Sequence, residues 1–271
     1  MIGAAPAKVN LALVVGPPRP DAKHEVLTLL QRVSLADEVE LEPAERTVVD
    51  GFDGDTIVAD ALARLAKATD HEGGWAVRIE KRIPIAAGLG GGSSDAATAL
   101  RLANATLPEP LPPARLHALA AAVGADCPFF LEPGPALASG DGSTLQPVAL
   151  PTDFALVLLA PHGETKRSTG EVYRRFDARA GEEGYEGRAQ SLRAALAAVR
   201  TAADLAALPP NDLAGSDLSR ELIAAGAFRA DVSGAGPTLY GLFHDRSSAE
   251  AAAPSLARLG QVWVVEPSWY G

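Results

Sequence analysis

A glycine-rich segment at residues 84–94 has the composition of a phosphate-binding loop. It reads Pro-Ile-Ala-Ala-Gly-Leu-Gly-Gly-Gly-Ser-Ser and lies between a strand-like and a helix-like pattern. Glycine reaches backbone conformations that a Cβ disfavours, so successive N–H groups can converge on one anion. Ser93 or Ser94 can cap the following helix, whose N-terminal dipole favours the same negative charge. The segment has neither the Lys-Ser/Thr of a P-loop nor the spacing of a dinucleotide fingerprint, and ordered flanks argue against a flexible linker.

Three other short segments carry residues that could take part in chemistry. Lys8 and Asn10 alternate with apolar residues, so a strand would place both on one face. Asp126 directly follows an expected helix that Gly124 closes in a left-handed conformation. Residues 233–236 form a second glycine turn. Taken alone, Lys8 also fits a solvated charge at a strand end, and Asp126 also fits the cap of a short helical turn.

The elements that must position these residues mix strand and helix patterns along the whole chain. Alternating or continuous apolar runs predict strands, helical spacing predicts helices, and residues 26–42 read as mixed strand and turn. The expected strands are 9–15, 75–83, 154–160, 238–243 and 262–265. The expected helices are 56–69, 114–123, 190–208 and 217–225, together with a helix that follows the glycine loop and runs through Leu100 and Ala103. A restart of the pattern at 147–151 predicts two domains, 1–150 and 151–271.

Bulk properties indicate an enzyme-sized globular protein. The 271 residues are 47% hydrophobic and 21% charged, and no run approaches the 18 apolar residues of a membrane span. Residues 1–10 lack the features of a signal peptide, so a cytoplasmic location is expected. A net charge of −10 without any basic run argues against nucleic-acid binding. The single Cys127 cannot form an internal disulfide and is expected to be a small buried hydrophobe.

Together, these segments resemble the motifs of the GHMP kinases, in the order expected for that family. The resemblance rests on residues 5–11, 88–97, 124–130, 211–213 and 233–236, and it spans nearly the whole chain. It implies an α+β fold of two domains, the N-terminal one similar to domain 2 of ribosomal protein S5 and the C-terminal one ferredoxin-like. It also implies ATP as the phosphate donor, with Mg²⁺ bridging the phosphate oxygens.

Within the family, the motifs look like those of members that phosphorylate the 2-hydroxyl of a cytidine diphosphate-linked methylerythritol, in the non-mevalonate isoprenoid pathway. The resemblance makes Asp126 the base and places Lys8 beside it, where a cation lowers the pKa of the carboxylate and stabilises the transferring phosphoryl group. Ser94 is a candidate contact to the metal or to a phosphate, and no carboxylate ligand of the metal is identified. The implied ATP-binding residues are Pro84, Ile85, Ala86, Ala87, Gly88, Leu89, Gly90, Gly91, Gly92, Ser93 and Ser94.

The implied acceptor site departs from the family pattern at one position. Where the family has Asp-Gly-Tyr-His, this chain has Asp-Ala-Lys-His, so His24 matches a cytosine contact and Lys23 replaces a stacking tyrosine. Lys23 could cover the base with its aliphatic stem, reach the diphosphate or point to solvent. Thr169 and Tyr173 align with the residues that lie against the nucleotide. The full implied set is Asn10, Lys23, His24, Asp126, Thr169 and Tyr173.

Two alternatives remain open from the residues. Another GHMP kinase, of the mevalonate or homoserine type, would share the phosphate loop, and His24 with Tyr173 argues against it. A nucleotide-binding regulator could retain the fold without the chemistry. The presence of both Lys8 and Asp126 argues against that reading.

Overall fold

The computed structural model describes residues 1–51, 57–163 and 168–268. The chain forms two compact units, and neither is continuous in sequence. The first comprises Met1–Ala7, Leu35–Ile85 and Gly90–Pro133, and the second comprises Lys8–Ser34, Ala86–Leu89 and Gly134–Gly271. The division is discontinuous because the long strands β1 (Ile2–Pro18) and β2 (His24–Ala44) each contribute residues to both units. The predicted domain boundary near residue 150 remains a prediction.

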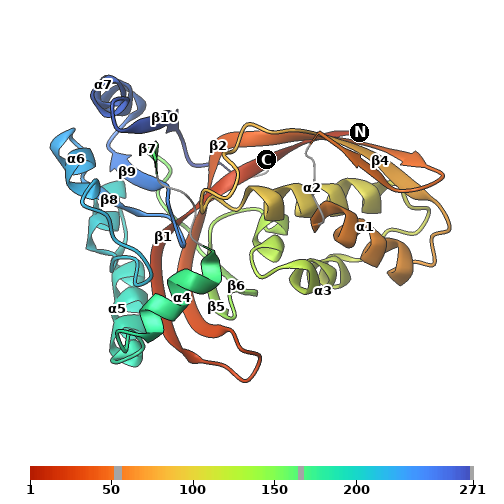
Figure 1. Cartoon of the computed structure of the whole chain (residues 1–271), viewed down its shortest axis with the longest axis horizontal. Coiled ribbons are helices and arrows are strands. Elements are labelled where there is room, and N and C mark those ends of the chain that lie inside the picture. The colour runs from red at the N-terminus through yellow and green to blue at the C-terminus, as the bar shows by residue number, and fades with distance from the viewer. Residues whose placement is uncertain (52–56, 164–167, 269–271) are drawn as a thin grey trace. The chain divides into compact units, whose positions relative to one another are not determined.

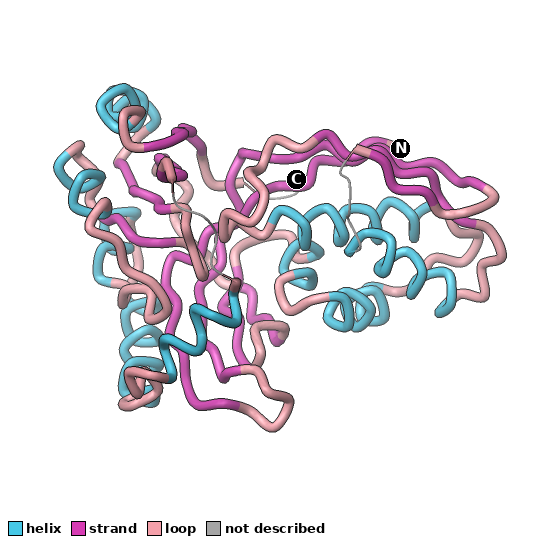
Figure 2. Tube along the Cα trace, in the orientation of Figure 1, coloured by secondary structure: helices cyan, strands magenta, loops and turns pink. Residues whose placement is uncertain are grey.

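In the first unit, three helices cover one side of a small sheet (Figures 1 and 2). The end of β2 pairs antiparallel with β4 (Gly74–Glu80), which pairs in parallel with β3 (Val48–Asp50). The helices are α1 (Ile57–Ala68), α2 (Gly91–Thr106) and α3 (Pro113–Val123), and the 3₁₀ helix η1 (Cys127–Leu131) follows α3. The alternating Trp75, Val77 and Ile79 are buried against the apolar faces of the helices, as the sequence predicts.

The second unit contains the early part of β2 and a separate four-stranded sheet. Residues 26–30 of β2 pair with β5 (Ala136–Gly140), and β5 pairs with β6 (Thr144–Pro147). The other sheet has the antiparallel order β10-β7-β9-β8. Its strands are β7 (Ala155–Pro161), β8 (Arg229–Val232), β9 (Leu239–Phe243) and β10 (Gly260–Val265). The unit's helices are α4 (Thr169–Asp177), α5 (Tyr185–Ala198), η2 (Ala202–Ala207), α6 (Ser219–Ala224) and α7 (Arg246–Leu256). Apolar residues of α6 and α7 pack against this sheet and form a hydrophobic core with it.

Two predicted elements differ most from the structure, and the strand expected at 75–83 ends earlier, at Glu80. The expected helix at 190–208 is interrupted, because Val199 is extended and Thr201 begins η2 in a capping box with Asp204. The region at 26–42 is part of one strand rather than a mixture of strand and turn. Residues 26–33 are all buried, so both faces of β2 are covered there and the alternation that signals a strand is absent. Thr56, the expected first residue of α1, lies outside the described residues.

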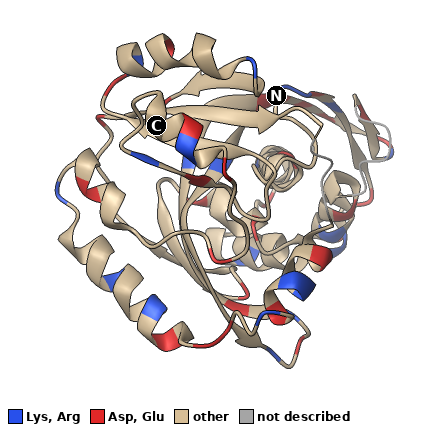
Figure 3. Ribbon diagram, turned by 60° about the vertical axis from the view of Figure 1, so that its left-hand side comes forward, with Lys and Arg blue, Asp and Glu red and all other residues tan. Residues whose placement is uncertain are grey.

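Several charged residues on the described helices form pairs of opposite sign. Figure 3 shows the basic and acidic residues interspersed along the ribbon. Three pairs span one helical turn, namely Asp60–Arg64, Glu171–Arg175 and Arg246–Glu250. Among the described helices, none is long and apolar enough to cross a membrane.

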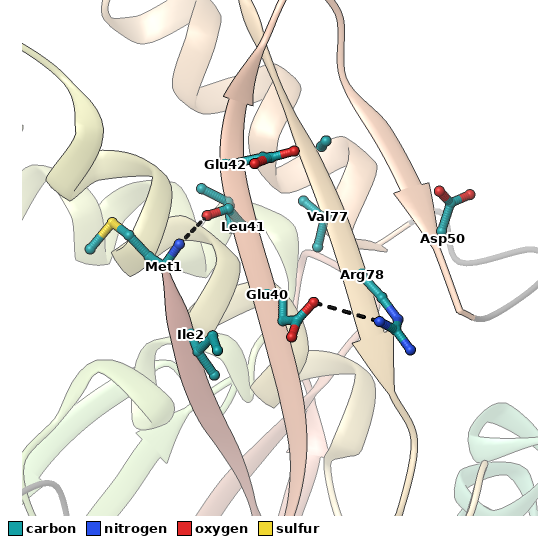
Figure 4. A pocket seen from close by; sticks show the side chains of 9 residues that line it. Met1, Ile2, Glu40, Leu41, Glu42, Asp50, Val77 and Arg78 are labelled. Carbon is teal, nitrogen blue, oxygen red and sulfur yellow. Dashed lines mark hydrogen bonds and ion pairs between the residues drawn. The ribbon is translucent and has the colours of Figure 1, made fainter.

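A pocket of about 350 Å³ lies at the beginning of β1, beside β2 and β4. Figure 4 shows Met1 and Ile2 on one side of it and Arg78 on the other. The N-terminal amino group donates to Leu41 O at 2.6 Å, and Glu40 lies 3.8 Å from Arg78. None of the site residues predicted from the sequence lines this pocket.

Candidate active site

The glycine loop leads into α2 without any side-chain cap. The helix begins at Gly91, and Gly90 holds the cap position in the left-handed conformation, with φ 72° and ψ 17°. Ser93 and Ser94 therefore lie inside the first turn, and the prediction that one of them caps the helix is wrong. The reason is local: glycine accepts a positive φ, so the helix starts before the serines are reached. The N–H groups of this first turn donate to no side-chain oxygen at the cap, so they can donate to a bound anion.

Ser94 presents a buried hydroxyl at the same place. Its side chain is fully buried, and its Oγ has no hydrogen-bond partner among the described residues. A buried hydroxyl without a partner is costly, and bound oxygen-rich ligands relieve that cost. The observation fits a contact between Ser94 and a phosphate oxygen or a hard cation.

Asp126 lies immediately before η1 and is partly exposed. Its side chain makes no capping hydrogen bond to this short helix, so the capping alternative is not what the structure contains. The neighbouring Cys127 thiol contacts the Ser93 side chain, and burial raises the pKa of Cys127 to about 11. Cys127 is thus the buried hydrophobe expected from the sequence. The same contact brings the segment that carries Asp126 to the first turn of α2.

Gly124 does not adopt the left-handed conformation expected at the end of α3. Its φ of −176° and ψ of 151° are those of extended backbone. The backbone is therefore extended directly after α3. The Cys127 N–H then donates to Gly124 O at 3.1 Å, which closes a short turn. That short turn sets the position of Asp126.

In the second unit, Lys8 and Asn10 lie buried on the same face of β1. Both are only 4% exposed, which excludes the solvated strand-end reading of Lys8. Lys8 Nζ donates to Asn10 Oδ1 at 2.7 Å, and Asn10 Nδ2 donates to Thr28 Oγ1 at 2.8 Å. Thr28 in turn donates to Ala12 O. This chain of hydrogen bonds orients the ammonium group, and the sequence offered no sign of the role of Thr28.

The second glycine turn packs against these residues and against part of the first loop. Ser233 Oγ donates to Gly88 O at 3.0 Å, and the Lys8 N–H donates to Leu89 O at 2.9 Å. A Cβ built on Gly234 would lie 3.2 Å from Asn10 Oδ1 and 3.6 Å from Lys8 Nζ. The structure thus joins Lys8, Asn10, residues 86–89 and the turn at 233–236, which are far apart in sequence.

Asn211 holds that second turn in place, a role that the sequence motif alone does not reveal. The side chain is buried, and Nδ2 donates to Val232 O at 2.9 Å and Gly234 O at 2.6 Å. Oδ1 accepts the Leu213 N–H at 2.8 Å. Every hydrogen bond of this amide goes to backbone, so it sets the path of the turn.

Substituting Asn211 with alanine is expected to lower the free energy of unfolding by about 1–3 kcal/mol, because two buried carbonyls lose their donor. Chemical denaturation followed by circular dichroism measures the change. Asp217→Ala is the control, since that side chain is 93% exposed and should change stability by less than about 0.5 kcal/mol. Equal losses in both variants would contradict the role of Asn211.

His24 and Tyr173, both implied as contacts of the nucleotide, lie side by side in the structure. Their ring centroids are 4.7 Å apart with 30° between the planes, and Phe176 packs edge-on to His24. His24 Nε2 lies 2.8 Å from Asp177 Oδ1, which fixes the orientation of the imidazole. Asp177 is a residue that sequence reasoning missed. Thr169 is the first residue of α4 and is exposed.

Lys23 is not stacked in this ring cluster. Its ammonium group lies 2.5 Å from Asp141 Oδ2, in the turn after β5, and its side chain is about half exposed. Lys23 and Ser143 hold the pKa of Asp141 down to about 2, against the opposing effect of burial. Lys8 and Asp126 belong to different compact units, and the expected contact between them stays a prediction.

Comparisons with known proteins match this arrangement. Residues 56–134 match the GHMP kinases N terminal domain family, and residues 216–261 match the GHMP kinases C terminal family. The 4-diphosphocytidyl-2-C-methyl-D-erythritol kinase of Anaeromyxobacter sp. (strain Fw109-5) is 40% identical over 266 residues, covering 93% of this chain and 85% of that protein.

Solved structures agree with these matches. A crystal structure of 4-(cytidine 5'-diphospho)-2C-methyl-D-erythritol kinase superposes with a TM-score of 0.79 at 33% identity, covering 99% of this chain and 100% of the other. The homoserine kinase of Cytophaga hutchinsonii has a TM-score of 0.73 at 19% identity, covering 98% and 95%, and shares the fold. The predicted two-domain α+β fold is confirmed. This chain belongs to the GHMP kinases and, within them, to the 4-diphosphocytidyl-2-C-methyl-D-erythritol kinase family.

Proposed function

We propose that this chain transfers the γ-phosphate of ATP to the 2-hydroxyl of 4-diphosphocytidyl-2-C-methyl-D-erythritol, with the side chains predicted from the sequence. The observation that carries the assignment of the donor site is the start of α2. There a glycine holds the cap position, no side chain occupies the cap, and Ser94 contributes a buried hydroxyl. Phosphate is the ligand class that best suits such a helix start.

ATP binds along residues 84–94 in this proposal. Backbone N–H groups at the start of α2 donate to phosphate oxygens, and the positive φ of Gly88 and Gly90 turns the chain around the phosphates. We include Mg²⁺ in the proposal because this ion usually binds few protein ligands and completes its coordination with phosphate oxygens and water. The orphaned hydroxyl of Ser94 fits such a contact. When bound, the ion neutralises charge on the phosphates.

Asp126 accepts the proton of the acceptor hydroxyl as the new bond to phosphorus forms. A tertiary alcohol is a weak nucleophile while it is protonated, so a positioned carboxylate assists the transfer. The position of Asp126 supports the assignment, because the adjacent Cys127 thiol contacts Ser93 in the first turn of α2. Lys8 stabilises the negative charge on the transferring phosphoryl group, and its burial beside Asn10 strengthens that interaction because water screens it less.

The cytidine end of the acceptor contacts the His24–Tyr173 pair. Two rings with centroids 4.7 Å apart leave no space for a third ring, so insertion of the base requires the pair to separate. Asp177 holds one imidazole nitrogen and leaves the other for the base. Thr169 lies at the beginning of the same helix as Tyr173. The pairing of Lys23 with Asp141 supports a site in which Lys23 does not stack on the cytosine.

Phosphorylation assays with three acceptors test the function. The purified chain, ATP and Mg²⁺ are incubated separately with the cytidine-linked acceptor, mevalonate and homoserine, and ADP formation is measured. Turnover of the first acceptor alone is expected. Turnover of mevalonate or homoserine without the first would favour the other GHMP kinases, and ATP binding without any turnover would favour a regulator.

Replacing Tyr173 with alanine is expected to raise KM for the acceptor about tenfold, because a stacked base is worth roughly 1–3 kcal/mol. KM for ATP should change by less than about twofold, since the ring lies on α4 rather than on the glycine loop. Steady-state kinetics with each substrate varied in turn measures both constants. Tyr173→Phe retains the ring and serves as the control. Equal increases in the two KM values would reject the stacking assignment.

A further inference from the structure

A cluster of three charged side chains packs against the first residue of α2. Lys81, directly after β4, has its Nζ 2.5 Å from Asp37 Oδ2 and 2.6 Å from Asp95 Oδ2. The two carboxylates are 0% and 1% exposed, and the lysine side chain is 16% exposed. None of the sequence motifs indicated Lys81 or Asp37, and Asp95 was noted only as part of the glycine-rich motif.

The cluster anchors the residues that precede the glycine loop. Asp37 Oδ1 accepts the Arg82 N–H at 2.5 Å and the Ile83 N–H at 2.7 Å. These are the last two residues before Pro84, where the loop begins. Asp37 itself lies on β2 and is buried, so the start of the loop is tied to a long strand.

The same cluster anchors the residues that follow the loop. Asp95 lies on α2, two residues after Ser93. Its ion pair with Lys81 connects this helix to the residue that directly follows β4. A Cβ built on Gly91 would lie 3.2 Å from Ile83 Cγ2 and 3.4 Å from Lys81 Nζ. The first residue of α2 therefore packs directly on the cluster. The Lys81 ammonium group thus links Asp95, which follows the loop, to Asp37, which holds the residues that precede it.

The charges explain why a cation is needed here. Two carboxylates share one lysine, and Asp95 Oδ1 has no hydrogen-bond partner among the described residues. Burial raises the pKa of Asp95 to about 7, although Lys81 acts in the opposite direction. Without Lys81, two buried carboxylates would face each other under a helix start that has to accept phosphate, and each would disfavour the bound anion.

We propose that Lys81 is a positioning residue for ATP: by binding Asp37 and Asp95 together, it holds the start of the loop and the start of α2 at the spacing that the triphosphate requires. This inference rests on the proposed role of residues 84–94 as the ATP loop. Small displacements of positioning groups are costly, since a shift of roughly 1 Å can lower a rate about 10²-fold. The predicted consequence is specific to the nucleotide and spares the acceptor.

The test compares Lys81→Met with Lys81→Arg in the full-length chain, with Lys67→Met as the control. Lys67 is an exposed lysine in the last turn of α1, in the same compact unit. Lys81→Met should raise KM for ATP about tenfold or more and leave KM for the acceptor within about twofold. Lys81→Arg preserves the charge and should stay within about threefold of the wild type. Lys67→Met should match the wild type.

A double variant keeps the test decisive if Lys81→Met does not fold. Lys81→Met with Asp95→Asn removes one charge of each sign, so the net charge of the cluster is unchanged, and Asp37 keeps the backbone N–H donors of Arg82 and Ile83. Its KM for ATP should still rise at least about fivefold, because the tie between the loop ends is gone. A folded single or double variant with the KM for ATP of the wild type would overturn the inference. Failure of the wild type to phosphorylate the cytidine-linked acceptor would instead overturn the proposed function.

Discussion

Replacing Asp126 with asparagine is expected to lower kcat by about 10²–10⁴-fold, the range associated with loss of a positioned base. Asparagine has nearly the same shape but cannot accept the hydroxyl proton. Binding of ATP should change by less than about twofold, because the nucleotide contacts assigned to residues 84–94 remain. The free energy of unfolding should change by less than about 1 kcal/mol, because asparagine keeps the size of this partly exposed side chain.

Three measurements separate these effects: turnover under saturating substrates, ATP binding by calorimetry, and thermal unfolding. Asp153→Asn is a matched control, because Asp153 is an exposed aspartate in a loop before β7. It should behave as the wild type does. Turnover near the wild-type rate in Asp126→Asn would remove Asp126 from the mechanism, whereas loss of ATP binding would assign it to the donor site instead.

Replacing Gly88 with alanine is expected to disrupt both stability and ATP binding. Gly88 has φ +81°, a region in which residues with a Cβ are strained by about 1–2 kcal/mol. An added Cβ would also lie only 2.5 Å from Ser233 O, which is backbone and cannot rotate away. We expect the free energy of unfolding to fall by at least ~2 kcal/mol. KM for ATP should rise more than about tenfold, because the first glycine loop and the second glycine turn must move apart.

Denaturation curves and ATP kinetics for this variant are compared with those of Gly187→Ala. Gly187 lies in α5, has no atom within 4 Å of a built Cβ, and does not have a positive φ. Alanine there should be neutral or stabilising by up to about 1 kcal/mol. If Gly88→Ala were as stable as the control and bound ATP normally, the close approach of Gly88 to Ser233 would have no functional importance.

The sequence alone was sufficient for the family, the fold class and most helices and strands. Motifs such as Lys8 with Asn10, the glycine loop and Asp126 are local, and their spacing along the chain already restricts the chemistry. The alternating pattern at 75–79 and the helical spacing in α1 also report burial on one face, which is a property of neighbouring residues. His24 could likewise be matched to the family motif, although Lys23 stands where the family has a tyrosine.

Only the tertiary structure decided which distant groups meet. The start of α2 depends on Gly90 taking a left-handed conformation, and this displaced the serines from the cap. The strand β2 is covered on both faces over 26–33, so its pattern does not alternate. Asn211 reaches Gly234, and Lys81 joins Asp37 to Asp95 across 44 and 14 residues of sequence. A hydrogen bond or ion pair depends on where folding places the two partners, and residue types along the chain do not specify that.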